Sequence, residues 1–301
     1  MSVQDYLAAQ KIGKREYNAC VNKGKYPYLP VLENLISEDD IDSEISLGND
    51  QIPLSLVVGT CNAARTNAFA GNFMPLLEWG TEFSAKWASL SDSQVNEGIR
   101  DPIKVYEYMN KFYVLEGNKR VSVLKYFKAV TVNAEVIRKV PKKSDKPEVK
   151  IYYEFMDFYK CTKLNDIYFS QVGSFYTFMN LVGIEKGEEM DEDARKDLVS
   201  CYLSFKNAFD AKGGGRFDYP AGDAFLRFIH IFGYDTVKEM STSEMAKNVA
   251  KSWAEFQLLS EDSEIDLSMD PGNTEVEKNT LSDRLPWSSG DSKKLKVGFI
   301  Y

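Results

Sequence analysis

The residues best placed to do chemistry in this chain are Gly117, Asn118, Lys119 and Arg120, which follow the apolar segment 112–116. Their order predicts a strand that passes through a glycine turn into a helix. Backbone N–H groups and the positive end of the helix macrodipole favour an anion at a helix N-terminus, and Lys119 and Arg120 add formal charge there. We therefore expect these residues to bind a phosphate-bearing ligand. The alternative for Lys119 is a lysine that is simply exposed in a first helical turn.

The segments on both sides of this turn predict a small mixed sheet. Residues 101–106 and 112–116 are predicted strands joined by a tight turn at Asn110 and Lys111. Val121, Leu124 and Phe127 recur at helical spacing, and residues 130–136 alternate apolar and polar side chains as a half-buried strand does. The expected order is therefore strand, strand, glycine turn, helix, strand.

A loop of small polar residues, 59–67, follows another predicted strand at 52–58. Loops on a rigid sheet often carry binding groups. We expect Thr60, Asn62 and Arg65 to face the same phosphate as Lys119 and Arg120. The alternative is an ordinary connection with a solvated arginine.

At these residues the sequence resembles the ParB N-terminal/sulfiredoxin-like (ParB-like nuclease domain) superfamily, over roughly residues 51–140. Members of that family place a Gly-x-x-Arg motif after a strand, as at Gly117 and Arg120. Residues 98–105 resemble the family's G-x-x-x-P-I-x-V element, and Arg65 resembles an arginine in an earlier loop. The resemblance implies a nucleotide ligand, which is CTP in partition proteins, ATP in sulfiredoxin and ADP in free-serine kinases, here expected with Mg²⁺.

The motif also departs from the family at one position. Asn118 stands where sulfiredoxin has its nucleophilic cysteine and where the partition proteins have a glutamate, so sulfinic-acid reductase chemistry is not expected. Gly117 and Arg120 keep the phosphate-binding pattern, whereas hydrolysis or phosphoryl transfer stays open. Glu116 is the nearest carboxylate that could act as a base or hold Mg²⁺. The alternative is a solvated glutamate at the end of a strand.

Composition is typical of a bacterial-type globular protein with an α+β fold. The chain has 301 residues, 44% of them hydrophobic and 13% aromatic, which allows a sizeable core and two small domains. We expect an N-terminal helical extension at 1–50, a mixed-sheet core at 51–140, a helical domain at 151–260, and a linker with the start of a further domain at 261–301. The net charge of −8 and pI near 5.0 oppose a main task of coating nucleic acid.

The four cysteines are far apart and the chain has one histidine, so the sequence predicts no zinc site and no disulfide framework. Reduced thiols are typical of the cytoplasm. The chain starts without the basic and apolar run of a signal peptide, and no segment is long and apolar enough to span a bilayer. We expect a cytoplasmic protein with no membrane partner.

Helices dominate the expected structure outside the sheet. The first fifty residues are predicted to form two short helices followed by an acidic loop at 38–44. Beyond a proline-rich linker at 141–147, apolar residues at helical spacing predict five helices, at 154–164, 168–182, 191–210, 221–232 and 243–259, with residues 213–216 as a turn. His230 is expected to be a satisfied core residue. Residues 294–301 resemble the first strand of a basic-membrane-protein (periplasmic-binding-type) domain.

The sequence thus predicts a nucleotide-binding protein that acts as a regulatory switch or in phosphoryl transfer. One alternative is a DNA-binding partition-type or transcription-related module, in which helices 221–232 and 243–259 would be parts of a helix-turn-helix. Residues 191–260 hold nine Lys/Arg against eleven Asp/Glu, which disfavours a recognition helix. Another alternative is a non-catalytic interaction scaffold, in which the helical domain serves packing or self-association.

Overall fold

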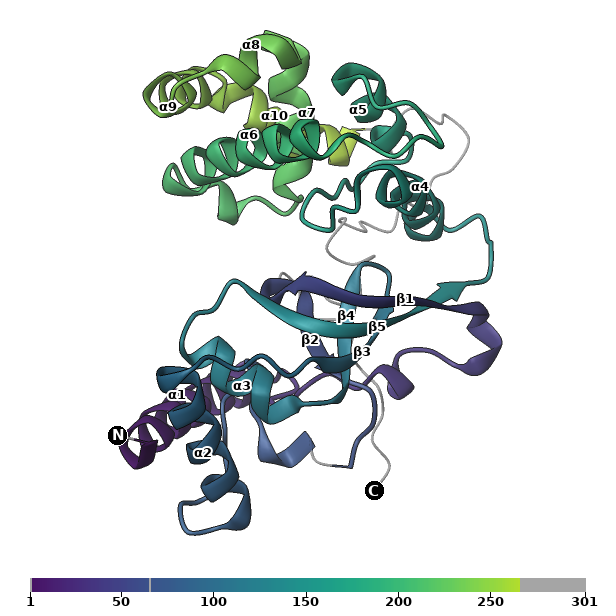
Figure 1. Ribbon diagram of the computed structural model, residues 1–301. Helices are drawn as coiled ribbons and strands as arrows, with labels where there is room; N and C mark the ends of the chain where they lie inside the picture. Colours follow the sequence, from purple (N-terminus) through teal and green to yellow (C-terminus); the bar gives the residue numbers. More distant parts are fainter. Residues whose placement is uncertain (1, 65, 266–301) are drawn as a thin grey trace. The chain divides into compact units, whose positions relative to one another are not determined.

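The computed structural model describes residues 2–64 and 66–265, and these divide after Lys143 into two compact units. The first unit contains a five-stranded mixed sheet with helices, and the described part of the second unit is helical (Figure 1). The predicted α+β class is confirmed. The first unit contains both the predicted helical extension at 1–50 and the predicted sheet core at 51–140.

The sheet of the first unit has the strand order β1-β5-β3-β4-β2. Its strands are β1 (Ile41–Pro53), β2 (Val57–Thr60), β3 (Ile103–Tyr108), β4 (Lys111–Glu116) and β5 (Thr131–Pro141). β1 is antiparallel to β5 and β3 to β4, whereas β3 runs parallel to β5 and β2 to β4. Because β2 and β4 are parallel, with Thr60 opposite Val114, both strands deliver their carboxyl ends to one edge of the sheet.

The hairpin between β3 and β4 turns at Met109 and Asn110, one residue earlier than predicted. Both residues have positive φ, 53° and 56°, as a two-residue turn of type I′ requires. The backbone N–H of Asn110 donates to Glu107 Oε1 at 2.6 Å, and the other oxygen of Glu107 pairs with buried Arg138 on β5. This buried ion pair fixes the end of the sheet that lies away from Gly117.

Three helices, α1 (Ser2–Asn22), α2 (Glu82–Asn96) and α3 (Asn118–Tyr126), pack together beside the sheet (Figure 1). The prediction of two short N-terminal helices is wrong, because α1 is continuous. Its buried residues Tyr6 and Ala9 share a core cluster with Trp87 of α2 and Val123 of α3. The buried residues of α1, Tyr6, Ala9, Gln10 and Gly13, lie on one face, which favours a single element over two.

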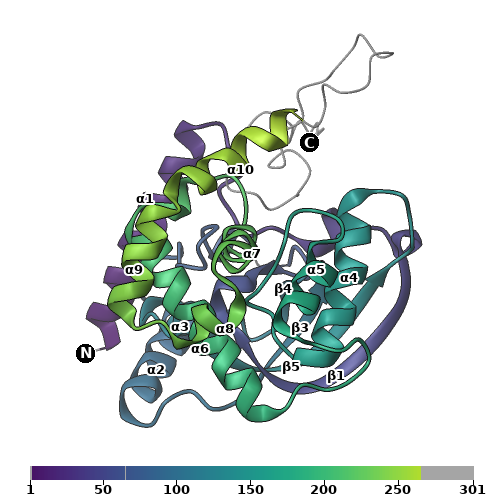
Figure 2. The same ribbon diagram turned by 90° about the horizontal axis from the view of Figure 1, so that it is seen from above.

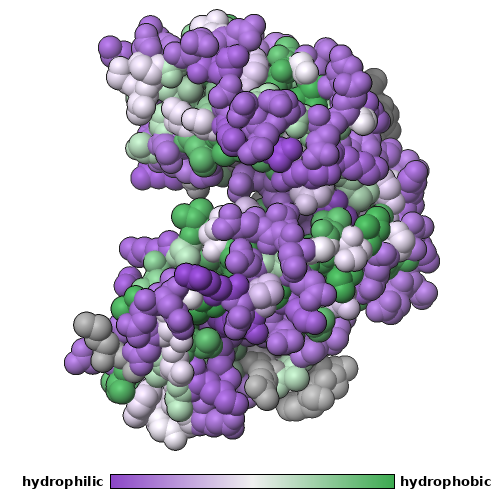
Figure 3. Space-filling model, viewed as in Figure 1, coloured by the Kyte–Doolittle hydropathy of each residue, from purple (hydrophilic) through white to green (hydrophobic). Residues whose placement is uncertain are grey.

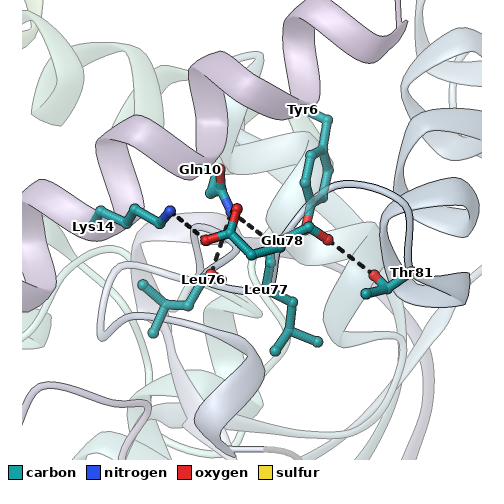
Figure 4. A network of polar contacts seen from close by, with 7 residues as sticks. All are labelled: Tyr6, Gln10, Lys14, Leu76, Leu77, Glu78 and Thr81. Carbon is teal, nitrogen blue, oxygen red and sulfur yellow. Dashed lines mark hydrogen bonds and ion pairs between the residues drawn. The ribbon is translucent and has the colours of Figure 1, made fainter.

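Polar contacts fix α1 to the segment that leads into α2 (Figure 4). The Tyr6 hydroxyl and Gln10 Nε2 both donate to the carbonyl of Leu77, at 2.7 and 2.6 Å. Lys14 forms an ion pair of 2.7 Å with Glu78. These contacts position the residues immediately before α2, and therefore the start of that helix.

Two further sequence predictions for the first unit need correction. The predicted acidic loop 38–44 is a short 3₁₀ turn, Glu38–Asp40, followed by the first residues of β1. The predicted strand 52–58 is the end of β1, a second 3₁₀ turn at Leu54–Leu56, and the first residues of β2. Further 3₁₀ turns lie at Leu32–Asn34 and Thr66–Ala68.

The second unit is built on aromatic packing. Its helices are α4 (Pro147–Thr162), α5 (Ser174–Val182), α6 (Glu192–Ala211), α7 (Ala221–Phe232), α8 (Tyr234–Glu239), α9 (Thr242–Lys251) and α10 (Trp253–Ile265). Phe205 on α6 contacts Phe225 and Phe228 on α7 and Phe256 on α10, with ring centroids 5.1 to 6.0 Å apart. α7 lies between α5 and α10 (Figure 2), and it contacts both.

The helical predictions hold to different degrees. The helix at 221–232 has the predicted bounds, whereas the one predicted at 243–259 is two helices that meet at Ser252, and α8 was not predicted. Residues 213–216 form a turn with a short 3₁₀ helix, Gly214–Arg216. His230 is exposed rather than part of the core, because Phe225, Phe228 and Ile229 form the buried face of α7 and His230 lies off that face.

On the face that Figure 3 shows, hydrophilic residues predominate and apolar residues are scattered among them. Among the described residues, no helix combines the length and the apolar character that a membrane crossing requires. The linker predicted at 261–301 lies outside the described residues after Ile265, as does the segment 294–301 with its resemblance to a periplasmic-binding-type strand.

Candidate functional site

A pocket of about 590 Å³ opens where β2 and β4 end and α3 begins. Seven of the residues singled out in the sequence line it, namely Thr60, Asn62, Glu116, Gly117, Asn118, Lys119 and Arg120. Arg65 lies outside the described residues. The carboxyl ends of parallel strands are a common ligand position in sheets with helical connections.

Gly117 forms the sharp turn between β4 and α3. Its φ of 110° is left-handed, and a Cβ there would lie 2.6 Å from Cγ2 of Ile103. Only glycine fits both conditions. The Val121 N–H donates to the Gly117 carbonyl at 3.1 Å, so the helix starts directly after the turn. The N–H groups of the first turn of α3, which have no acceptor within the helix, point to the same edge as the strand ends.

Asn118 is tied to β2 through Thr60. The Thr60 hydroxyl donates to the Val114 carbonyl at 3.0 Å, so its oxygen must accept the second contact, from Asn118 Nδ2 at 3.2 Å. This assigns the orientation of the Asn118 amide. Asn118 Oδ1 is then a buried acceptor, and no described residue donates a hydrogen bond to it. Thr60 therefore positions Asn118, and Asn118 presents an acceptor that a ligand or a metal ion can use.

Arg120 holds the start of β3 against α3. Its Nη1 donates to the carbonyls of Pro102 and Asp101, the latter at 3.4 Å, and its Nη2 lies 3.5 Å from Glu116 Oε1. Its side chain is 21% exposed, against 64% for Glu116. One nitrogen of the guanidinium thus donates to backbone carbonyls, while the positive charge of the group remains at the pocket.

Two lysines add positive charge on the side of the pocket that faces α2. Lys119 Nζ lies 4.9 Å from the centroid of the Phe83 ring. Lys86 extends from α2 and forms an exposed pair of 2.5 Å with Glu82, one turn earlier. With Arg120, the lining residues carry three positive charges against one, that of Glu116. This balance favours an anionic ligand.

Helix α2 is the part of the site that sequence reasoning missed. It supplies Phe83, Lys86, Ser89 and Leu90, of which Phe83 and Leu90 form the apolar wall of the pocket together with Leu29 and Phe69. A signal was present, because Phe83, Trp87 and Leu90 recur at helical spacing after Thr81, whose side chain accepts the Ser84 N–H at 3.2 Å. Trp87 Nε1 donates to the Ser122 hydroxyl at 2.8 Å and holds α2 against α3.

Cys61 directly follows Thr60 but is not available as a nucleophile. Its thiol is buried and donates to the Tyr113 carbonyl at 3.4 Å, and burial raises its pKa to about 12. The thiolate, which is the reactive form, is therefore negligible near pH 7. All four cysteines are free thiols, as the sequence predicted.

Comparison of the chain with protein-family models and with curated proteins found no match in either set.

Proposed function

We propose that the first unit binds a nucleotide, with its phosphates at the N-terminus of α3. The observation that carries this proposal is the convergence of Asn118, Lys119, Arg120 and the first turn of α3 on one pocket at the carboxyl ends of β2 and β4. Backbone N–H groups, the helix dipole and fixed cations are the usual components of a phosphate site. The resemblance of residues 51–140 to the ParB/sulfiredoxin-like superfamily supports the same ligand class.

The dimensions of the pocket suit a ligand larger than phosphate alone. Its volume of about 590 Å³ lies within the usual range of roughly 300–1,000 Å³ for small-molecule sites. Phe69 and Phe83, whose rings are 5.2 Å apart, lie on its apolar wall. Phe69 is almost fully buried, whereas Phe83 is partly exposed, and an exposed aromatic face can stack on a nucleobase. We place the phosphates at α3 and the base toward Phe69 and Phe83.

The residues of the site also fit Mg²⁺ as a companion of the nucleotide. No three His, Cys, Asp or Glu side chains of the described residues converge as a metal site, but Mg²⁺ is usually held by one or two protein oxygens, water and substrate phosphates. Asn118 Oδ1 is a buried oxygen acceptor, and the carboxylate of Glu116 lines the same pocket. These two groups would hold the ion, which would neutralise phosphate charge when bound.

We further propose that the bound nucleotide serves as a regulatory switch or as a phosphoryl donor, in the cytoplasm, where free thiols stay reduced. Lys119 and Arg120 would orient the phosphates, and Glu116 would be the base if there is turnover. Asn118 cannot take that role, because its amide has no proton that titrates near neutral pH.

The test is a thermal-shift and calorimetric comparison of ATP, ADP, CTP and GTP, each with and without Mg²⁺, because a ligand that binds the folded state raises its stability. Lys119→Gln removes one charge from the pocket and should weaken binding by roughly 10- to 150-fold, the equivalent of about 1.5–3 kcal/mol for a charge-assisted contact. Lys11→Gln makes the same change at an exposed residue of α1 that does not line the pocket, and should leave affinity unchanged. Equal affinity in both variants, or no binding of any nucleotide to the wild type, would reject the proposal.

A further inference from the structure

A second cavity, of about 210 Å³, opens on the helical unit among residues of α5, α7 and α10. Asp223, Arg227 and His230 of α7 line it, together with Thr177 of α5 and Tyr219 from the segment before α7. None of these residues lines the proposed nucleotide pocket, so any ligand of the second cavity is independent of the proposed function.

The backbone of the helical unit is built to bring a carboxylate to this cavity. A Cβ on Gly222 would lie 2.1 Å from the Tyr168 carbonyl oxygen, so only glycine lets α7 approach that segment so closely. This approach brings Asp223 to Ser170, whose backbone N–H donates to Asp223 Oδ1 at 3.1 Å and whose hydroxyl donates to Oδ2. Asp223 is 9% exposed.

Asp223 carries a buried negative charge without a cationic partner among the described residues. The nearest cation along α7, Arg227, directs Nε and Nη2 to Glu255 on α10, at 3.2 and 2.6 Å. Burial raises the pKa of Asp223 to about 6, against the lowering effect of the Ser170 hydrogen bonds, as expected for a carboxylate that has no counter-ion. An unpaired buried charge is costly, and proteins usually provide it with a counter-ion.

Two of the hydroxyl groups that line the cavity are already used as donors. The Tyr219 hydroxyl donates to the Phe256 carbonyl at 2.6 Å, and the Thr177 hydroxyl donates to the Gly173 carbonyl at 3.0 Å. Each oxygen therefore offers only lone pairs to the cavity. Asp218, which also lines it, is a carboxylate that accepts from the Ser260 hydroxyl at 3.2 Å. A ligand that matches these acceptors must itself be a donor.

We propose that this cavity binds the primary ammonium group of a small amine, with Asp223 as its counter-ion and the oxygens of Tyr219 and Thr177 as further acceptors. An ammonium group has three N–H donors and one positive charge, which matches one carboxylate and two neutral oxygens. The volume corresponds to about seven water molecules at the roughly 30 Å³ that each has in the liquid, which suits an amino alcohol.

The test uses the full chain and two probes of equal size, ethanolamine and ethylene glycol, at constant pH and ionic strength. Binding is followed by the NMR shifts of the backbone amides of Ser170, Thr177 and Asp223. Ethanolamine should shift these signals saturably, and ethylene glycol should not. Asp223→Asn can keep both contacts with Ser170 but removes the charge, and should weaken ethanolamine binding at least tenfold.

Thr177→Val is the second variant, because Thr177 is an exposed helical residue and the change leaves Asp223 and Ser170 in place. It should weaken ethanolamine binding severalfold with the fold intact. This variant therefore tests the proposed ammonium site even if Asp223→Asn does not fold. Equal shifts with both probes, no saturable shift with ethanolamine, or wild-type affinity in both variants would show that Asp223 only fastens Ser170 to α7.

Discussion

Glu116, the last residue of β4, and Arg120, in the first turn of α3, lie on either side of Gly117, and their charges act on the same pocket in opposite directions. Arg120 attracts a phosphate, whereas Glu116 repels it and shares the guanidinium at 3.5 Å. Because Glu116 is largely exposed, water screens its charge and the repulsion is modest. Its carboxylate is nevertheless the only one among the residues that line this pocket.

Glu116→Gln separates the electrostatic role of this residue from a catalytic one. In the absence of Mg²⁺ the substitution should raise nucleotide affinity by roughly two- to fivefold, because it removes a surface charge interaction of about 0.4–1 kcal/mol. Any nucleotide hydrolysis or phosphate transfer to free serine should fall sharply, because glutamine cannot accept the proton. Calorimetry and a phosphate-release assay measure the two effects. Turnover that survives the substitution would place the base elsewhere, and lower affinity without Mg²⁺ would contradict the repulsive role.

At this scale the sequence predicted which residues gather but not how each is used. The spacing of Gly117 and Arg120 after a strand identified the turn, because strand, glycine and helix signals are local. The donation from Arg120 to the carbonyls of Asp101 and Pro102 joins two elements and has no local signature. The same holds for Asn118, whose amide is oriented by Thr60 on another strand.

Among the elements, the hairpin β3–β4 and helix α3 were predicted because their apolar residues alternate or recur on one buried face. β1 was missed because most of its residues from Asp42 to Gln51 are exposed on both sides, so no alternation marks it. What holds β1 in the sheet is backbone pairing with β5 along its whole length, which the sequence pattern of β1 alone does not reveal. α2 was missed for two reasons. Serine, a weak helix former, is frequent in it, and its capping box has Ser84 at the third helical position, where glutamate or glutamine is usual.

The cap of α2 gives a test at the scale of the element. Thr81→Ala removes the side-chain oxygen that accepts the Ser84 N–H, and should destabilise α2 by about 1 kcal/mol. Native-state hydrogen exchange measures this as a loss of protection that is confined to the amides of α2.

Ser241→Ala is the matched control, because the Ser241 hydroxyl accepts the Glu244 N–H at the start of α9, in the other unit. It should lower the protection of α9 by a similar amount and leave α2 unchanged. Loss of protection throughout both units in either variant would contradict a local capping role.

For the whole molecule, the distribution of charge argues against a nucleic-acid partner. The chain carries 37 Lys and Arg against 45 Asp and Glu. Many of the cations are also paired on the surface, such as Lys14 with Glu78, Lys206 with Asp210 and Arg227 with Glu255. A cation already paired with a carboxylate contributes little to phosphate neutralisation on a duplex. Of the helices that invite comparison with a helix-turn-helix, the one at 221–232 has a single arginine, and the one at 242–251 has only Lys247, Asn248 and Lys251, fewer basic and amide side chains than a recognition helix usually presents.

We therefore expect the full chain to bind duplex DNA at or beyond the weak end of the roughly 10⁻⁴–10⁻⁶ M that non-specific binding shows at physiological salt. Fluorescence anisotropy of a labelled duplex at about 150 mM salt, repeated at about 50 mM, measures both the affinity and its salt dependence. A small salt dependence should accompany weak binding, because few phosphates are neutralised and few counter-ions are released. Each titration is repeated with saturating nucleotide and Mg²⁺, so that a nucleotide-dependent DNA affinity is also detected. Micromolar or tighter binding at about 150 mM salt, in either state, would contradict the expectation and favour a partition-type function.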